Sequence, residues 1–374
     1  MALANFTPYY KPSAGICRMK EDLAILPAWY APIGSMIKTA GGNALNQLQE
    51  SCDFLPDVKE TARWIPAILR PWGWDPALCH NARIEGFPSE RLPSESWLEH
   101  IRYLSARPQA KLFLDELRVR FPHTCGEMAE CHNLMQVKAA VGYYGKSLLK
   151  APWSGSGRGL VATSPTLWDQ NVENRVARIL RGQGTIMVEP MYGKVKDLAM
   201  EFQADGKGNV QFSGYSLFET DVRGCYKLNF IGTDEWITRQ LDPYIDKKLL
   251  EEIWKELETL LARWIDPCYA GYLGIDMMLC ETADGFRLHP CVEINLRMNM
   301  GTVAHIVADR YVHPDAHGRY IIEYHAQKGE AYKAHQCLKE AFPLQIIDGR
   351  IYGGYFPLTP VNADTHYRIY LLIG

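Results

Sequence analysis

The stretch that decides the fold runs from residue 271 to residue 295 and reads GYLGIDMMLCETADGFRLHPCVEIN. It contains two apolar runs, and the dipeptide Asp284-Gly285 lies between them. An Asp-Gly pair between apolar runs is typical of a two-residue β-hairpin turn. We therefore predict an antiparallel pair of strands, 272–281 and 286–295.

The register of this predicted hairpin brings acidic side chains together. A turn centred on Asp284-Gly285 places Asp276 directly opposite Glu293, and Asn295 lies two residues farther along on the same face. Opposed Cβ atoms are about 4.5–5.5 Å apart. Two carboxylates at that spacing repel unless a cation lies between them, and oxygen ligands suit Mg²⁺ or Mn²⁺. We therefore predict a metal site made of Asp276, Glu293 and Asn295.

Two further features bear on this hairpin. A solvated hairpin face is the alternative, but Asp276 interrupts an otherwise apolar run, which favours a buried functional position. The same register places Pro290 opposite Leu279, where proline cannot donate a ladder hydrogen bond. The sequence therefore predicts either an edge strand or a β-bulge at Pro290.

A glycine-rich loop lies upstream of the hairpin. Lys150 ends a short predicted strand, and the loop after it contains Ser154, Gly155, Ser156, Gly157 and Gly159. Glycines let backbone N–H groups approach phosphate oxygens, and a lysine supplies the matching charge. The loop lacks the Walker A pattern. Phosphate binding is the functional interpretation, and a flexible Ser/Gly-rich hairpin is the alternative.

A third signal follows a predicted buried strand at 185–189. Glu189-Pro190 reads as an extended linker that can offer main-chain groups to a flat heterocycle, and Asp197 could accept hydrogen bonds from ribose hydroxyls. Because Pro190 has no N–H, the N–H of Met191 is the remaining donor. A plain linker between domains explains the same residues.

These signals, in this order, resemble the ATP-grasp superfamily over about residues 111–301, half of the chain. The resemblance implies that the Lys150 loop binds the phosphates of ATP, that Glu189, Met191 and Asp197 bind the nucleoside, and that the acidic hairpin holds Mg²⁺ or Mn²⁺. It also implies an ATP-binding lysine about forty residues before Lys150. Lys111 fits that spacing, and Lys138 is the alternative.

The resemblance also implies an architecture. We expect an α/β (α+β) chain with the ATP-grasp fold, in which two α+β subdomains clasp the nucleotide behind a smaller N-terminal α/β domain. The expected boundaries are 1–106 for the N-terminal domain, 107–188 for the subdomain with the glycine-rich loop, and 189–374 for the subdomain with the metal site and a C-terminal extension.

The activity that the resemblance implies is ATP-dependent ligation. A carboxylate of a small molecule or peptide would be activated as an acyl phosphate and attacked by an amine or thiol, with formation of ADP. Lys150 and Arg297 would neutralise charge on the transferring group, and Arg223, in a polar segment, is a candidate for binding the substrate. A phosphotransferase and a non-catalytic nucleotide-binding protein on the same fold are the alternatives.

Composition narrows the partners. The chain has 374 residues, 22% of them charged, and a formal net charge of -3, which argues against binding nucleic acid or an anionic membrane surface. The ten cysteines include no Cys-x-x-Cys pair, so reduced thiols are expected. No signal peptide or membrane-spanning run is evident. We expect a cytoplasmic protein, with a homodimer as one arrangement.

Overall fold

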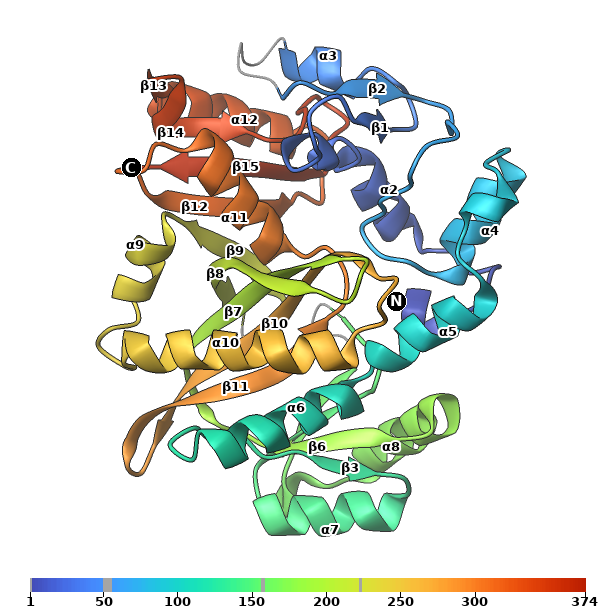
Figure 1. Ribbon diagram of the computed structural model, residues 1–374, viewed down its shortest axis with the longest axis vertical. Coiled ribbons are helices and arrows are strands. Elements are labelled where there is room, and N and C mark those ends of the chain that lie inside the picture. Colours follow the sequence, from blue (N-terminus) through green and yellow to red (C-terminus); the bar gives the residue numbers. More distant parts are fainter. Residues whose placement is uncertain (1, 50–55, 156–158, 222–223) are drawn as a thin grey trace.

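The computed structural model of the protein describes residues 2–49, 56–155, 159–221 and 224–374 (Figure 1). The described strands form three sheets, of nine, four and two strands. The order in the large sheet is β11 (Gly285–Asn295), β10 (Ala270–Thr282), β7 (Gly193–Asp205), β8 (Val210–Thr220), β9 (Tyr226–Ile231), β12 (Gly318–Tyr324), β15 (Tyr367–Ile373), β14 (Arg350–Pro357) and β13 (Gln345–Ile347).

Helices cover both faces of the large sheet (Figure 1). Helix α10 (Lys247–Trp264) buries Leu250, Ile253 and Leu257 against one face, because its apolar residues recur at helical spacing. Helix α11 (Met300–Tyr311) packs on β8 and β9 at the other face. The remaining helices of this half are α9 (Asp234–Arg239) and α12 (Glu330–Ala341). None of the described helices is long and apolar enough to cross a bilayer.

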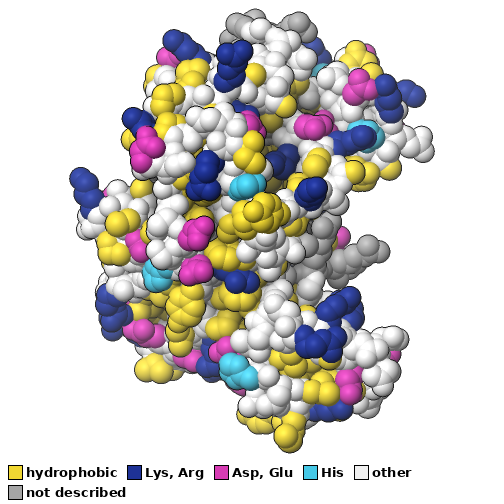
Figure 2. Space-filling view, turned by 90° about the vertical axis from the view of Figure 1, so that its right-hand side faces the viewer, with side chains coloured by type: hydrophobic (Ala, Val, Ile, Leu, Met, Phe, Trp, Pro, Cys, Tyr) yellow, Lys and Arg dark blue, Asp and Glu magenta, His cyan; other side chains and the backbone are white. Residues whose placement is uncertain are grey.

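A small lobe holds the four-stranded sheet. Its strand order is β3 (Ala129–Cys131), β6 (Ile186–Pro190), β4 (Ser147–Lys150) and β5 (Leu160–Thr163). It also contains α7 (Leu134–Tyr144), η3 (Pro165–Leu167) and α8 (Gln170–Gln183). The apolar sides of the sheet and of α7 and α8 form a separate core. Figure 2 shows a hollow in the outline of the molecule between this lobe and the rest.

The first part of the chain consists of short elements. They are α1 (Ala2–Asn5), α2 (Ala14–Asp22), η1 (Leu26–Trp29), β1 (Met36–Lys38), α3 (Ala44–Gln49), β2 (Lys59–Thr61), α4 (Pro76–Ile84), η2 (Ser89–Arg91) and α5 (Glu95–Leu104). Helix α6 (Arg107–Arg120) then leads to the small lobe. The first elements share one core with the C-terminal strands: Trp29 is fully buried against the Phe356 ring, and its Nε1 donates to the Leu358 carbonyl at 2.7 Å.

The hairpin of β10 and β11 has the predicted register at the acidic residues and a different one at its turn. Asp276 lies opposite Glu293, as predicted, but Thr282 pairs with Gly285, so the turn is one residue earlier than expected. The register shifts between Asp276 and Met278, where β11 has extra residues that include Pro290. Strand β11 is also the edge of the sheet. The bulge compensates for the earlier turn, and both features predicted for Pro290 are present.

Candidate functional site

The acidic hairpin brings its three predicted metal ligands into one polar cluster. Asn295 Nδ2 donates to Asp276 Oδ2 at 3.0 Å, and Glu293 is the direct cross-strand partner of Asp276. Arg297 follows the strand, and its Nη2 donates to Asn295 Oδ1 at 2.8 Å. The predicted residues Asp276, Glu293, Asn295 and Arg297 therefore lie together at the end of β11.

Arg107 connects this cluster to the glycine-rich loop. Its Nη2 donates to Glu293 Oε2 at 2.9 Å, and its Nη1 donates to Ser154 Oγ at 2.7 Å and to the Ala151 carbonyl at 2.6 Å. The side chain is only 6% exposed. The loop that follows Lys150 thus begins beside the acidic hairpin, although the two are more than a hundred residues apart in sequence.

Lys150 forms a buried ion pair across the small lobe. Its Nζ lies 2.6 Å from Glu189 Oε2, and the two side chains are 8% and 5% exposed. The other carboxylate oxygen, Oε1 of Glu189, is buried without a hydrogen-bond partner. Buried charges need partners, so the unpaired oxygen indicates a position that a ligand donor could fill.

Burial and neighbouring carboxylates disfavour the ionised form of Asp276 in the acidic cluster. Burial raises the pKa of Asp276 well above its ordinary value, and the nearby carboxylates of Glu293 and Glu201 raise it further, while Arg297 acts in the opposite direction. Within the described part of the chain no group of three or more His, Cys, Asp or Glu residues could hold a metal. Two carboxylates and an amide oxygen nevertheless fit Mg²⁺ or Mn²⁺, which takes its remaining ligands from phosphate and water.

Glu201 is a buried carboxyl beside this cluster that sequence reasoning missed. It is 1% exposed on β7, and its Oε2 accepts hydrogen bonds from Asn299 Nδ2 and Thr302 Oγ1, each at 2.8 Å. A Cβ on Gly274 would lie 2.5 Å from its Oε2, and one on Gly301 would lie 2.3 Å from its Oε1, so a larger residue at either position would displace the carboxyl. Burial raises the pKa of Glu201 to about 7, against the effect of its hydrogen bonds.

Glu201→Gln is expected to stabilise the metal-free protein at about pH 8, by about 1–3 kcal/mol. Because the folded-state pKa lies above the unfolded value of about 4.3, the folded state binds more protons, and the free energy of unfolding falls as pH rises from about 4 to about 7. The glutamine oxygen can still accept from Asn299 and Thr302, without a charge. Thermal unfolding in EDTA across this range should show a flatter pH dependence for the variant, and equal slopes would contradict the assignment.

Lys111 and Met191 are placed differently from what the sequence predicted. Lys111 pairs with Asp115 one turn farther along α6, and Arg107, at the start of the same helix, is the residue that reaches Glu293. Arg107 lies 43 residues before Lys150, close to the spacing from which Lys111 was predicted. The Met191 N–H donates to the Lys146 carbonyl at 2.8 Å. We therefore retain neither residue as a nucleotide ligand.

The other predicted residues are distributed as follows. Asp197 lies on β7, where Lys194 Nζ contacts its Oδ2 at 2.6 Å and Thr220 Oγ1 donates to it at 2.8 Å. Gly159 has a φ of 84°, and a Cβ there would lie 2.9 Å from Ser154 Cβ, so the loop needs glycine at this position. Gly155 lies just after Ser154 in the described start of the loop. Ser156, Gly157 and Arg223 lie outside the described residues.

His289 is a second feature that sequence reasoning missed. It is fully buried on β11, and neither ring nitrogen has a hydrogen-bond partner. Burial and the charge of Lys150 lower the pKa of His289 to about 3, so its ring is neutral. The ring packs against Gly126 and meets the Tyr192 ring at 5.6 Å. No motif marks it, because its surroundings come from segments far apart in sequence.

Comparisons with known proteins place this geometry in a known fold. No family model matches the chain, and no curated protein matches it in sequence. Among solved structures, the chain is similar to biotin carboxylase from Campylobacter jejuni in complex with β-γ-ATP. The TM-score is 0.52 at 15% identity, and the match covers 94% of this chain and 85% of that chain. The chain has the ATP-grasp fold.

Two longer proteins also match the chain in structure. Pyruvate carboxylase from Rhizobium etli gives a TM-score of 0.50 at 13% identity over 91% of this chain and 36% of that chain. The biotin carboxylase domain of 2-oxoglutarate carboxylase from Hydrogenobacter thermophilus gives 0.43 at 14% identity over 72% of this chain. This chain spans 62% of that domain, less than two thirds of its length. The α+β ATP-grasp fold predicted from the sequence is confirmed, and the domain boundaries at 106 and 188 stay a prediction.

Proposed function

We propose that the protein is a Mg²⁺-dependent ligase that uses ATP to activate a carboxylate as an acyl phosphate for attack by an amine or thiol. The observation that carries this proposal is the link between the acidic hairpin and the glycine-rich loop through Arg107. Arg107 contacts Glu293 at 2.9 Å and Ser154 at 2.7 Å. One side chain thus touches both the proposed metal site and the proposed phosphate loop.

The proposed roles follow from charge. Asp276, Glu293 and Asn295 would hold Mg²⁺, which supplies charge neutralisation at the phosphates when bound. Lys150 and the backbone N–H groups of the Ser154–Gly159 loop would bind the phosphate oxygens. Arg107 and Arg297 would stabilise negative charge on the transferring phosphoryl group. Phosphoryl transfer needs positioning and charge stabilisation rather than a protein nucleophile.

Support for a ligase over its alternatives comes from the fold and the site together. The C. jejuni structure to which the chain is similar is a biotin carboxylase in complex with β-γ-ATP. At 15% identity this likeness concerns the fold, so the carboxylate and the nucleophile remain open. A phosphotransferase would use the same phosphate and metal ligands but would release a phosphorylated product. A non-catalytic binding protein would not need both carboxylates and both arginines at one place.

A screen for ADP release tests the proposal. Purified protein with ATP and Mg²⁺ is incubated with pooled amino acids, short peptides and other carboxylic acids, each with and without added amines or thiols. We expect ADP formation that depends on a carboxylate and a nucleophile together, and mass spectrometry should detect an amide or thioester. A phosphorylated product that needs no nucleophile would favour the phosphotransferase. Nucleotide binding without ADP release in every pool would favour a binding protein.

A further inference from the structure

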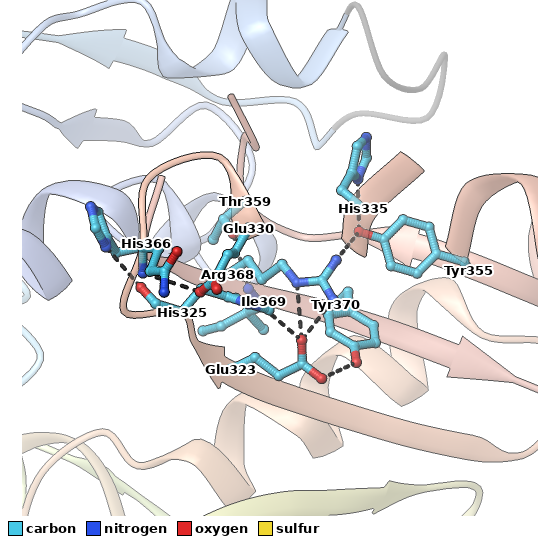
Figure 3. A network of polar contacts seen from close by, with 11 residues as sticks. Glu323, His325, Glu330, His335, Tyr355, Thr359, His366, Arg368, Ile369 and Tyr370 are labelled. Carbon is cyan, nitrogen blue, oxygen red and sulfur yellow. Dashed lines mark hydrogen bonds and ion pairs between the residues drawn. The ribbon is translucent and has the colours of Figure 1, made fainter. Parts of the chain in front are cut away.

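A groove lies between helix α12 and strands β12 and β15 (Figure 3). Its volume is about 710 Å³, within the range of about 300–1,000 Å³ that is typical of small-ligand sites. Glu323 and Arg368 from the strands lie on one side, and Ala334 and Leu338 from the helix lie on the other. The groove therefore combines a polar floor with an apolar wall.

This groove is separate from the proposed ATP site. Directly paired residues of neighbouring strands point to the same face of a sheet. Asp276 pairs with Ala199 on β7, which pairs with Ser216 on β8. Phe218, two residues along β8 and therefore on the same face, pairs with Asn229 on β9, which pairs with Tyr320 on β12. Tyr320 and Asp276 therefore share a face, and Glu323, three residues beyond Tyr320, points to the opposite face.

The floor of the groove is a charged pair that is held rigidly. Arg368 is 2% exposed, and its Nη2 and Nε donate to Glu323 Oε2 at 2.6 and 3.1 Å. The Tyr370 hydroxyl donates to Glu323 Oε1 at 2.8 Å, and its ring lies 4.7 Å from the Arg368 guanidinium. His325 Nε2 lies 3.2 Å from Glu323 Oε2. The carboxylate thus has one fixed orientation.

A second layer fixes the arginine. Arg368 Nη1 donates to the Tyr355 hydroxyl at 3.4 Å, and His335 Nδ1 lies 2.8 Å from the same hydroxyl (Figure 3). Burial, with the charges of Arg368 and Lys339, lowers the pKa of His335 to about 4, so the ring stays neutral. Apolar residues in place of a buried ion pair are often as stable or more stable. Stability alone therefore gives little reason for this network.

The carboxylate is open to a hydrogen-bond donor. Glu323 is 35% exposed. Across the described residues, its Oε1 accepts only from Tyr370, although a carboxylate oxygen has two acceptor positions. Burial acts to raise the pKa of Glu323, but hydrogen bonds from Tyr370 and Arg368 hold it below its ordinary value, so the group is ionised. The guanidinium of Arg368 is buried and already paired with Glu323. It is therefore not accessible to bind an anionic ligand.

From this arrangement we propose that the groove is a second ligand site, which binds a small organic amine through its ammonium group on Glu323. The ammonium donates to the free position of Oε1. The alkyl part lies along Ala334 and Leu338, which line the wall. The proposal is independent of the ligase function, because the two sites are on opposite faces of the sheet.

Calorimetric titration of the full chain without nucleotide tests this. The probe is n-butylamine, and n-butanol and butyrate are neutral and anionic probes of the same chain length. We expect saturable binding of one n-butylamine, with the other probes at least about tenfold weaker, which is about 1.4 kcal/mol. Absence of saturation by n-butylamine at about 10 mM, or equal binding of butyrate, would overturn the proposal.

Three variants locate the site. Glu323→Gln should weaken n-butylamine at least about tenfold. Ala334→Trp should fill the groove from α12 without touching the Glu323–Arg368 pair, and should abolish binding while the Tm stays unchanged. Because Ala334→Trp leaves the charged pair intact, this variant tests whether the amine binds in the groove even if Glu323→Gln fails to fold. Glu219→Gln, a 46% exposed carboxylate on β8, is the control and should bind as the wild type. Unchanged binding by folded Ala334→Trp would refute the site.

Discussion

Glu293→Gln is expected to lower Mg²⁺-dependent ATP turnover at least about a thousandfold, which corresponds to about 4 kcal/mol. Glutamine keeps the shape of the side chain and can still accept a hydrogen bond from Arg107. It removes the charge that, together with Asp276, would hold the metal. The substrate found in the screen provides the turnover measurement. Binding of a non-hydrolysable ATP analogue should also lose its dependence on Mg²⁺.

A matched control lies on the same hairpin. Glu281→Gln changes an exposed carboxylate on β10, outside the acidic cluster, and should retain turnover within about twofold. In EDTA, Glu281→Gln should unfold at the wild-type temperature. Glu293→Gln should still unfold cooperatively but at a lower temperature, because it leaves the buried guanidinium of Arg107 with a neutral acceptor in place of its carboxylate partner. Wild-type turnover by Glu293→Gln would remove the proposed metal site.

Lys150→Ala is expected to impair both stability and catalysis. The change leaves Glu189 buried without its ion-pair partner, which costs about 3–5 kcal/mol of unfolding free energy. It should also raise the KM for ATP or lower kcat at least about tenfold, because a phosphate ligand is lost. Denaturant unfolding and steady-state kinetics on the same preparation measure the two effects. Lys111→Ala, on the 30% exposed lysine that pairs with Asp115, is the control. It should change the free energy of unfolding by less than about 0.5 kcal/mol and the kinetic constants by less than about twofold.

A double variant separates the two roles of Lys150. Lys150→Met combined with Glu189→Leu replaces the buried ion pair by apolar side chains of similar size, and should recover most of the lost stability. Catalysis should not recover, because the cation is still absent. Recovery of turnover together with stability would mean that Lys150 only supports the fold and that the phosphates bind elsewhere.

Local sequence patterns predicted the pairing of the two strands at the acidic residues correctly, but they misplaced the turn by one residue. The alternation of side chains and the Asp-Gly dipeptide gave the pairing of Asp276 with Glu293, which the structure has. The turn itself is one residue earlier, and the bulge at Pro290 restores the pairing. Proline in a paired strand was the sequence signal for that bulge. The prediction worked at the acidic residues because the shift at the turn and the shift at the bulge cancel.

Long-range contacts were beyond sequence reasoning. Arg107 reaches Glu293 across 186 positions, and the pair Glu323 and Arg368 spans 45. Neither has a local pattern, because strand order in a large sheet decides which distant residues meet. Lys111 lies one turn farther along α6 than Arg107 and pairs with Asp115 of its own helix, which no sequence spacing indicated. The buried surroundings of His289 likewise come from separate segments.

The core shared by the first elements and the last strands has a consequence for synthesis. Trp29 is fully buried, and its partners Phe356 and Leu358 leave the ribosome more than three hundred residues later. The segment around Trp29 must therefore wait, with its aromatic groups exposed, until residues 356–358 have been synthesised. Apolar surface that stays exposed during such a delay favours aggregation. Slowing elongation between residues 30 and 355 should increase aggregation of this protein.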